Sequence, residues 1–114
     1  MIPSIDNAIE FANQNLSQMY SVQEWAKEYG YQSPKIFSKH FRNHFKERPS
    51  KVLIQLKIER ALKLLGSERC HKNYTIAQEI GLADEQALYK FIKYHTGYSP
   101  SDFKESLYRY RANS

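Results

Sequence analysis

Residues 50–66 read SKVLIQLKIERALKLLG and directly follow a proline, and this stretch decides the fold. A proline in the first turn and a glycine after the last apolar residue predict a helix of about 16 residues, Pro49 to Gly66. At helical spacing, one apolar stripe contains Ile54, Ile58, Ala61 and Leu65. The only wholly polar strip contains Lys51, Gln55 and Glu59. Because further apolar residues lie outside the stripe, we expect this helix to be held from more than one side.

The sequences on either side of this helix are copies of each other, offset by 51 residues without a gap. Matched pairs are Gly30 with Gly81, Ala26 with Ala77, Lys39 with Lys90, His44 with His95 and Pro49 with Pro100. Two copies are too few for a solenoid, which needs at least about three repeats. We therefore predict two pseudo-symmetric units, residues 1–48 and 67–114, joined by a central linker helix over residues 49–66.

Composition places this chain among globular proteins. Its 114 residues are 41% hydrophobic and 25% charged, which fits one compact domain or two very small lobes that share a helix. No apolar run approaches the roughly 18 residues that span a bilayer, and the N-terminus lacks the basic flank and apolar core of a signal peptide. The single cysteine, Cys70, excludes an internal disulfide and a cysteine-based zinc site. We expect a cytoplasmic protein without a membrane partner.

The charge is distributed unevenly along the chain. Residues 1–30 carry a balance of −3, so the remaining residues carry +8 of the overall +5. The basic residues after residue 30 are therefore where a polyanion would bind. Many proteins with a pI near 9 nevertheless do not bind nucleic acid.

The first copy contains the signals of two helices joined by a tight turn. Ser4 is expected to cap an initial packing helix, and a capping box that starts at Ser21 begins the next one. That helix ends at Gly30, and the pair Ser33-Pro34 begins another. A turn this short requires a glycine that can take positive φ, so a helix-turn-helix is predicted.

The helix after this turn separates its residues into two faces. The inward face is expected to contain Phe37, Phe41 and Phe45. The opposite face carries Lys35, Ser38, Lys39 and Arg42. A cationic helix that follows a tight turn suits the DNA major groove, which is wide enough to admit an α-helix. An ordinary solvated face of a surface helix fits the same pattern, and this helix alone does not decide between them.

The second copy repeats the arrangement with less charge. Asp84 is expected to cap a helix whose Leu88 and Ile92 point inward. Its outward face carries Gln86, Tyr89, Lys90 and Lys93. Glu85 is ambiguous, because it could accept from a cytosine amino group or simply be solvated. A second capping box, Ser99 to Asp102, is expected to begin a last helix.

Together these parts resemble the DNA-binding domain of the AraC/XylS family of bacterial transcription regulators. The resemblance runs from about Leu16 to Lys104 and includes the central LKIERALKLL and the closing GYSPSDFK. Three positions depart from the family pattern, which usually has glycine at Lys46, arginine at Lys57 and phenylalanine at Leu82. At Lys46 we expect either a unit that closes without positive φ or local backbone strain.

The resemblance implies an all-α fold of about seven helices and a sequence-specific regulator that inserts two recognition helices into successive major grooves of double-stranded DNA. Carried over by position, the base contacts would be Lys35, Ser38, Lys39, Gln86, Tyr89 and Lys90. Arg42 and Lys93 would hold phosphates. Because the two reading faces differ in sequence, an asymmetric site is expected. No cofactor and no metal are expected.

Other function classes fit the sequence less well. An enzyme is disfavoured, because the sequence has no P-loop, no G-x-G-x-x-G, no nucleophile elbow and no H-E-x-x-H. The main alternative is a helical protein-protein interaction module with only non-specific DNA affinity. RNA binding is weaker, because no sheet is predicted on which bases could stack. RNA polymerase and a separate effector-binding or dimerisation domain remain open as partners.

Overall fold

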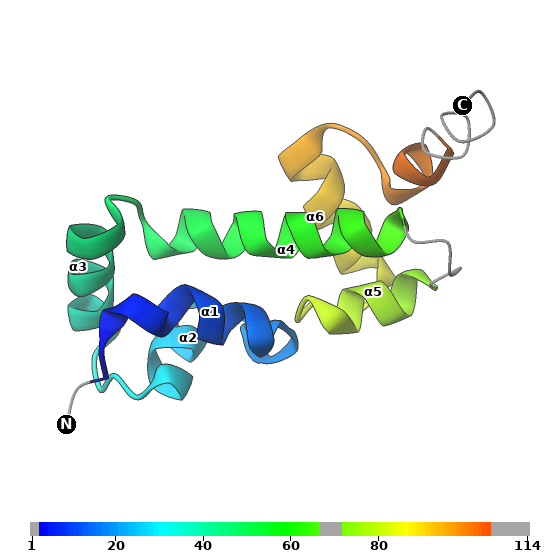
Figure 1. Ribbon diagram of the computed structural model, residues 1–114. Coiled ribbons are helices and arrows are strands. Elements are labelled where there is room, and N and C mark those ends of the chain that lie inside the picture. Colours follow the sequence, from blue (N-terminus) through cyan, green and yellow to red (C-terminus); the bar gives the residue numbers. More distant parts are fainter. Residues whose placement is uncertain (1–2, 67–71, 106–114) are drawn as a thin grey trace. The chain divides into compact units, whose positions relative to one another are not determined.

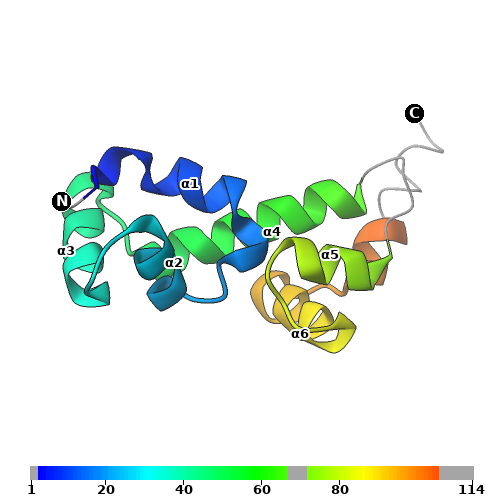
Figure 2. The ribbon, with the colours of Figure 1, turned by 90° about the horizontal axis from the view of Figure 1, so that it is seen from below.

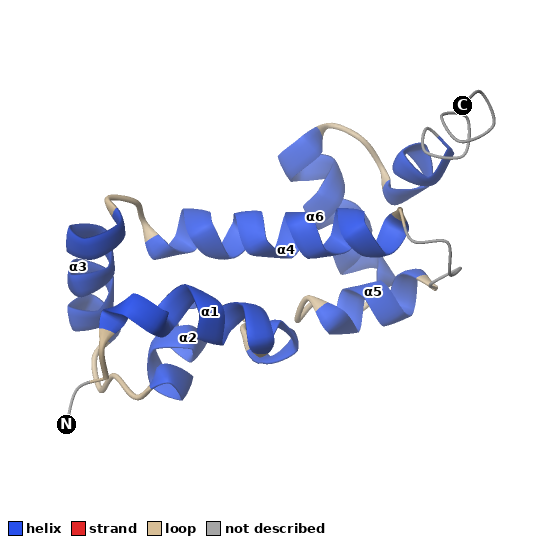
Figure 3. Ribbon diagram, in the orientation of Figure 1, coloured by secondary structure: helices blue, strands red, loops and turns tan. Residues whose placement is uncertain are grey.

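The computed structural model of this chain describes residues 3–66 and 72–105, and all regular structure in these ranges is helical (Figure 1, Figure 3). The bounded elements are the 3-10 helices η1 (Ile5–Asn7) and η2 (Leu16–Gln18) and the α-helices α1 (Ala8–Gln14), α2 (Val22–Tyr29), α3 (Pro34–Phe45), α4 (Pro49–Leu65), α5 (Asn73–Glu79) and α6 (Glu85–Thr96). Residues 100–105 are also helical. The all-α prediction is confirmed. None of the described helices is both long enough and apolar enough to cross a bilayer.

Residue contacts divide the chain into two units, Met1–Lys57 and Ile58–Ser114. In the first unit α2 packs against α3 and α1, and η1 packs against α3. In the second unit α5 packs against α6 (Figure 2). The helix α4 begins in the first unit and ends in the second. The predicted division into three parts, with the central helix as a part of its own, stays a prediction. Cys70 lies outside the described residues.

The chain enters the first unit through a 3-10 turn, whereas an α-helix was predicted there. Ser4 caps it as expected, because its Oγ accepts a hydrogen bond from the Asp6 N–H at 3.4 Å. The Ala8 N–H then donates to the Ile5 carbonyl, which is the i→i+3 bond of a tighter helix and is frequent at helix ends. The α-helix proper therefore begins only at Ala8.

An aromatic cluster forms the core of the first unit. Trp25 packs edge-on against Phe37 and Phe41, with ring centroids 5.2 and 5.1 Å apart, and all three side chains are fully buried. The Trp25 Nε1–H donates to the Ala8 carbonyl at 3.1 Å, so the one polar atom of the indole is satisfied. Phe45 is only half-buried, but its ring packs at a tilt against that of Phe41, with centroids 4.6 Å apart. The prediction that α3 turns its phenylalanines inward is confirmed for Phe37 and Phe41.

The two helix-turn-helix turns have the same hydrogen bonds. The Tyr31 N–H donates to the Ala26 carbonyl and the Leu82 N–H donates to the Ala77 carbonyl, each at 2.8 Å. The glycine between the helices has positive φ in both copies, 103° at Gly30 and 77° in the second unit. The predicted repeat is therefore a repeat of backbone geometry as well as of sequence.

Burial along α4 follows a period of four residues. The exposed line contains Lys51, Gln55, Glu59 and Lys63, which confirms the predicted polar strip. The buried line contains Pro49, Leu53, Lys57, Ala61 and Leu65. Ile54 and Ile58 of the apolar stripe are only half-buried, and the deepest burial falls on the line through Lys57. Partial burial on both flanks of this line agrees with the prediction that the helix is held from more than one side.

Lys57 is the unexpected member of that buried line. Its exposed fraction is 4%, and burial lowers the pKa of its ammonium from 10.5 to about 8. Taking a cation out of water disfavours the charged form, so at neutral pH this lysine reduces the stability of the fold.

We expect Lys57→Met to raise the free energy of unfolding by about 1–3 kcal/mol at pH 7, because a side chain of similar length replaces a desolvated cation. Below pH 8 the lysine is protonated in both the folded and the unfolded chain, so the cost is fully present. Between pH 8 and 10.5 the unfolded chain binds the proton more tightly, so the stability of the parent rises with pH.

Urea unfolding of parent and variant at pH 7, 9 and 10.5 measures this effect. The difference should shrink through that window, and titration of other groups cancels between the two proteins. A variant that is less stable than the parent at pH 7, or a constant difference, would show that burial of the charge is not costly.

Candidate functional site

The orientation of α3 is set at its first turn and by its buried face. The Ser33 Oγ accepts a hydrogen bond from the Ile36 N–H at 3.4 Å, and Pro34 occupies the first turn, as the sequence predicts. With Phe37 and Phe41 buried, the opposite side of the helix must face solvent. The side chains predicted to point outward do so: Lys35, Lys39 and Arg42 are exposed and Ser38 is half-exposed.

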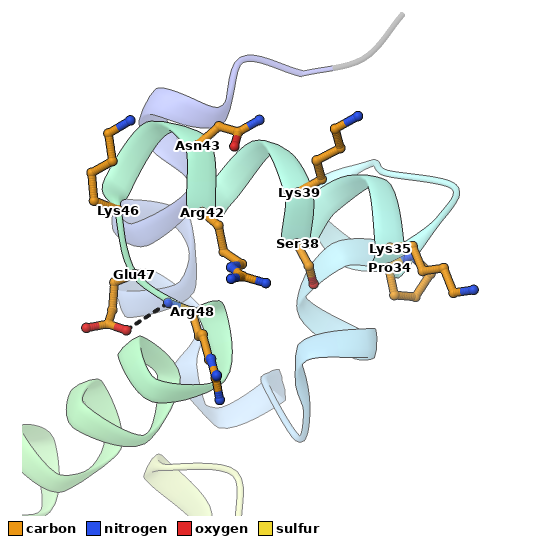
Figure 4. Close-up of a pocket in the computed structure, with 9 residues that line it drawn as sticks. All are labelled: Pro34, Lys35, Ser38, Lys39, Arg42, Asn43, Lys46, Glu47 and Arg48. Atoms are coloured by element: carbon orange, nitrogen blue, oxygen red, sulfur yellow. Dashed lines mark hydrogen bonds between the residues drawn. The ribbon is translucent and has the colours of Figure 1, made fainter.

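An open hollow of about 800 Å³ lies along this face of α3 (Figure 4). It is lined by Pro34, Lys35, Ser38, Lys39, Arg42, Asn43, Lys46, Glu47 and Arg48. Figure 4 shows Lys39, Asn43 and Lys46 on one side of the helix, and Ser38 and Arg42 on the side that faces Arg48. All four first-unit residues predicted to contact DNA therefore line one surface feature.

The electrostatic character of this hollow is positive. Five of its lining residues are Lys or Arg and only Glu47 is acidic. The Glu47 carboxylate accepts a hydrogen bond from the Arg48 N–H at 3.0 Å and pairs with Lys51 at 3.3 Å. The Arg48 N–H, followed by Lys51, lowers the pKa of Glu47. The only carboxylate of the hollow is therefore already paired. None of the five cations of the hollow forms an ion pair with another described residue.

The corresponding helix of the second unit, α6, presents a more aromatic face. The Asp84 Oδ1 accepts a hydrogen bond from the Ala87 N–H at 2.8 Å, which confirms the predicted cap. Leu88 and Ile92 are fully buried. The predicted outward residues are all exposed, namely Gln86, Tyr89, Lys90 and Lys93. Glu85 is exposed as well, which leaves both of its predicted roles open.

A second hollow, of about 560 Å³, lies on α6. It is lined by Tyr89, Lys90, Phe91, Lys93, Tyr94 and His95. Three of the residues predicted to contact DNA are among them, and Gln86 is not. Tyr94 is 84% exposed, and its ring lies 4.9 Å from that of His95. The face of α6 therefore combines two cations with exposed rings.

Sequence reasoning did not assign several lining residues to these surfaces, among them Asn43, Lys46, Arg48 and Tyr94. Asn43 lies on the outward side of α3 and Lys46 directly follows its last residue, and extending the helical period by one turn would have included both. Tyr94 directly follows Lys93, and sequence reasoning assigns it no role. Arg48 precedes α4 and has no helical period of its own, so no pattern indicated that it would line the hollow of α3.

The matched histidines lie beside aromatic rings and are exposed. His44 pairs with Asp6 of η1 at 3.3 Å through its Nε2, and its ring lies 4.6 Å from Phe45. His95 lies 4.7 Å from Phe91. Within residues 3–66 and 72–105, no group of three or more His, Cys, Asp or Glu side chains could hold a metal ion.

The departures from the family pattern have different structural outcomes. Lys46 has φ 61°, so the expectation that the first unit closes without positive φ is wrong and the alternative of local strain holds. Lys57 is buried, which removes it from the candidate surface. Leu82 is half-buried and follows the turn glycine as an apolar residue.

Comparison with known proteins gives one curated relative and several similar structures. No protein-family profile matches the sequence. A transcriptional regulatory protein of Bacillus subtilis, YesN, which is itself uncharacterized, is 30% identical over 98 residues. The match covers 85% of this chain but only 26% of YesN, so the chain spans about a quarter of the length of this relative.

Two solved structures have the same arrangement of helices. The DNA-binding domain of AdpA, a global transcriptional factor solved with a target DNA, superposes with a TM-score of 0.78 at 20% identity. The superposition covers 96% of this chain and 97% of that domain. A transcriptional regulator from Chromobacterium violaceum, of the AraC-type DNA-binding-domain proteins, gives 0.71 at 18% identity, with 90% of each chain covered. The chain therefore has the fold of the AraC-type DNA-binding domains, which is the fold that its sequence resemblance predicts.

Proposed function

We propose that this chain is a sequence-specific DNA-binding module of a bacterial transcription regulator, which inserts α3 and α6 into successive major grooves of double-stranded DNA. One observation carries the proposal. Each helix-turn-helix buries the apolar side of its second helix and leaves the opposite side polar and exposed. An α-helix with such a face fits the major groove, where Lys, Ser and Gln can bond to base edges.

The contacts divide into two kinds by their place on the helix. In α3 the base-reading residues are Lys35, Ser38 and Lys39, which lie in its first half, where recognition helices approach base edges. Arg42 lies a turn further along and binds a phosphate. In α6 the corresponding base-reading residues are Gln86, Tyr89 and Lys90, and the phosphate contact is Lys93.

The two readers differ in chemistry, which favours an asymmetric target. The face of α3 offers cations and a hydroxyl, whereas that of α6 offers an amide and a tyrosine ring beside its cations. Adenine accepts and donates toward an amide, whereas guanine presents two acceptors to a cation. The half-site under α6 should therefore differ from that under α3. The AdpA domain, which shares this fold, was solved on a target DNA, and this supports double-stranded DNA as the partner here.

Catalysis has no part in this proposal, since reading DNA requires only binding. A reader of the bacterial chromosome acts in the cytoplasm. RNA polymerase and an effector-binding or dimerisation domain are further partners that this role would call for.

A helical protein-interaction module is the second candidate function. The exposed rings of Tyr94 and Tyr98, 84% and 60% accessible, favour it, because large exposed aromatic side chains are common at protein interfaces. Such a module would bind DNA only through its charge, with affinity that depends on salt and not on sequence.

A binding selection from random duplex DNA near 0.15 M salt separates these two functions. We expect an asymmetric motif of two separate blocks to be enriched, because two different recognition faces each select their own bases. Titration of the enriched site against a scrambled one should give tighter binding to the former. Weak binding to both, lost as salt rises, would instead support the interaction module.

Two single substitutions in α3 test the division of roles. Lys39→Ala should relax base preference at one position, at a cost of about 1–3 kcal/mol against the preferred site. Arg42→Ala should weaken binding to all sequences alike and reduce the slope of log K against log salt by about 1. Both residues are exposed, so neither change should alter the unfolding midpoint. Identical behaviour of the two variants would show that the assignment of roles is wrong.

A further inference from the structure

The two units build the same joint after their recognition helix from different residues. In the second unit residues 97–100 read Gly-Tyr-Ser-Pro, and in the first unit the equivalent residues 46–49 read Lys-Glu-Arg-Pro. We call residues 46–48 the α3–α4 junction. The second unit thus shows which residues the same backbone has at the equivalent positions.

At the first position of the joint the two backbones agree. The Lys46 N–H donates to the Arg42 carbonyl, and the Gly97 N–H donates to the Lys93 carbonyl, each at 2.9 Å. Both residues are left-handed, with φ 61° at Lys46 and 83° at Gly97. Lys46 is the only non-glycine residue with positive φ in the described part of the chain. A β-carbon is disfavoured in this conformation, so glycine suits the position better than lysine.

At the third position the two units again share a backbone hydrogen bond and have different side chains. The Arg48 carbonyl accepts from the Val52 N–H and the Ser99 carbonyl accepts from the Phe103 N–H, each at 3.2 Å, so both residues precede a helix. Ser99 caps that helix, because its Oγ accepts from the Asp102 N–H at 3.1 Å and its own N–H donates to the Asp102 carboxylate at 2.9 Å. Arg48 has no acceptor to offer and loses this cap.

Where the second unit has Gly97 and Ser99, the first unit has a cation, and both cations line the same hollow. Lys46 and Arg48 are exposed and line the hollow of α3 together with Arg42 (Figure 4). Glu47, which lies between them in the sequence and also lines the hollow, accepts from the Arg48 N–H and pairs with Lys51, so its carboxylate is already engaged. Two residues that are locally unfavourable and that share one surface indicate selection for a function of that surface.

We propose that the α3–α4 junction binds the DNA backbone, with Lys46 and Arg48 each holding a phosphate in addition to the one held by Arg42. This inference rests on the proposed function and extends it. Phosphate is the ligand that fits, because both side chains are donors only and an arginine fork matches two phosphate oxygens. Base edges do not fit as well, since the junction lies beyond the end of the recognition helix.

Restoring the residues of the second unit tests this proposal. In the double variant Lys46→Gly/Arg48→Ser, the slope of log K against log salt on the selected site should become less negative by about 1.8, because two phosphates are released. At 0.1 M salt the same loss corresponds to about 60-fold weaker binding. The urea midpoint should rise or stay unchanged, since the variant gains a glycine and a cap. Improved folding with weaker binding is a combination that a purely structural role cannot produce.

Two single variants serve as companion and control. Arg48→Gln needs no backbone change and should make the slope of log K against log salt less negative by about 0.9. Lys63→Gln removes one charge from the exposed line of α4 and should leave the slope unchanged.

If the parent binds its site and the double variant has an unchanged slope, the proposed phosphate contacts of the junction are overturned and the proposed function is not. An equal effect of Lys63→Gln overturns it as well, because net charge would then explain the loss. A parent that binds no duplex DNA overturns the proposed function and the junction together.

Discussion

One hydrogen bond in each unit sets the direction of the helix that follows the turn, α3 in the first unit and α6 in the second. The residue after the turn glycine donates its N–H back to the carbonyl of a buried alanine, from Tyr31 to Ala26 and from Leu82 to Ala77. This bond closes only if the chain passes through positive φ, and at Gly30 an added Cβ would also lie 3.0 Å from the ring of Pro3. Once the bond is closed, the next helix can leave the turn in only one direction.

The rotation of that helix about its own axis is then set by the core. In the first unit Trp25 lies against both Phe37 and Phe41, so α3 cannot turn without removing a ring from the cluster. Turning it would also bring Lys39 or Arg42 toward a dry interior, where an unpaired cation is costly. Burial of the phenylalanines and exposure of the cations are therefore a single constraint. The exposed polar face of α3 follows from the core, and separate positioning of each outward side chain is unnecessary.

Sequence periodicity was sufficient for features that depend on local rules. The inward rings of α3, the outward residues of α6 and the cap at Asp84 all follow from spacing and from which side chains can accept a backbone N–H. Burial of Lys57 could not be found in this way, because deepest burial on α4 is set by the coverage of both of its flanks and not by its apolar residues alone. The left-handed backbone at Lys46 was equally hidden, since two outcomes were open and only the structure decides between them.

The internal repeat shows how a cost in stability can be accommodated. The first unit carries Lys46 in a left-handed conformation and Arg48 without a cap, whereas the second unit has the favoured Gly97 and Ser99. Among the described residues, the fully buried aromatic side chains also belong to the first unit. Aromatic packing buries more apolar area per side chain than the isoleucines and leucine at the equivalent places of α5 and α6. The unit with the larger buried side chains is thus the one that retains two unfavourable cations. A first unit with the smaller buried side chains of the second would have less stability to spare for them.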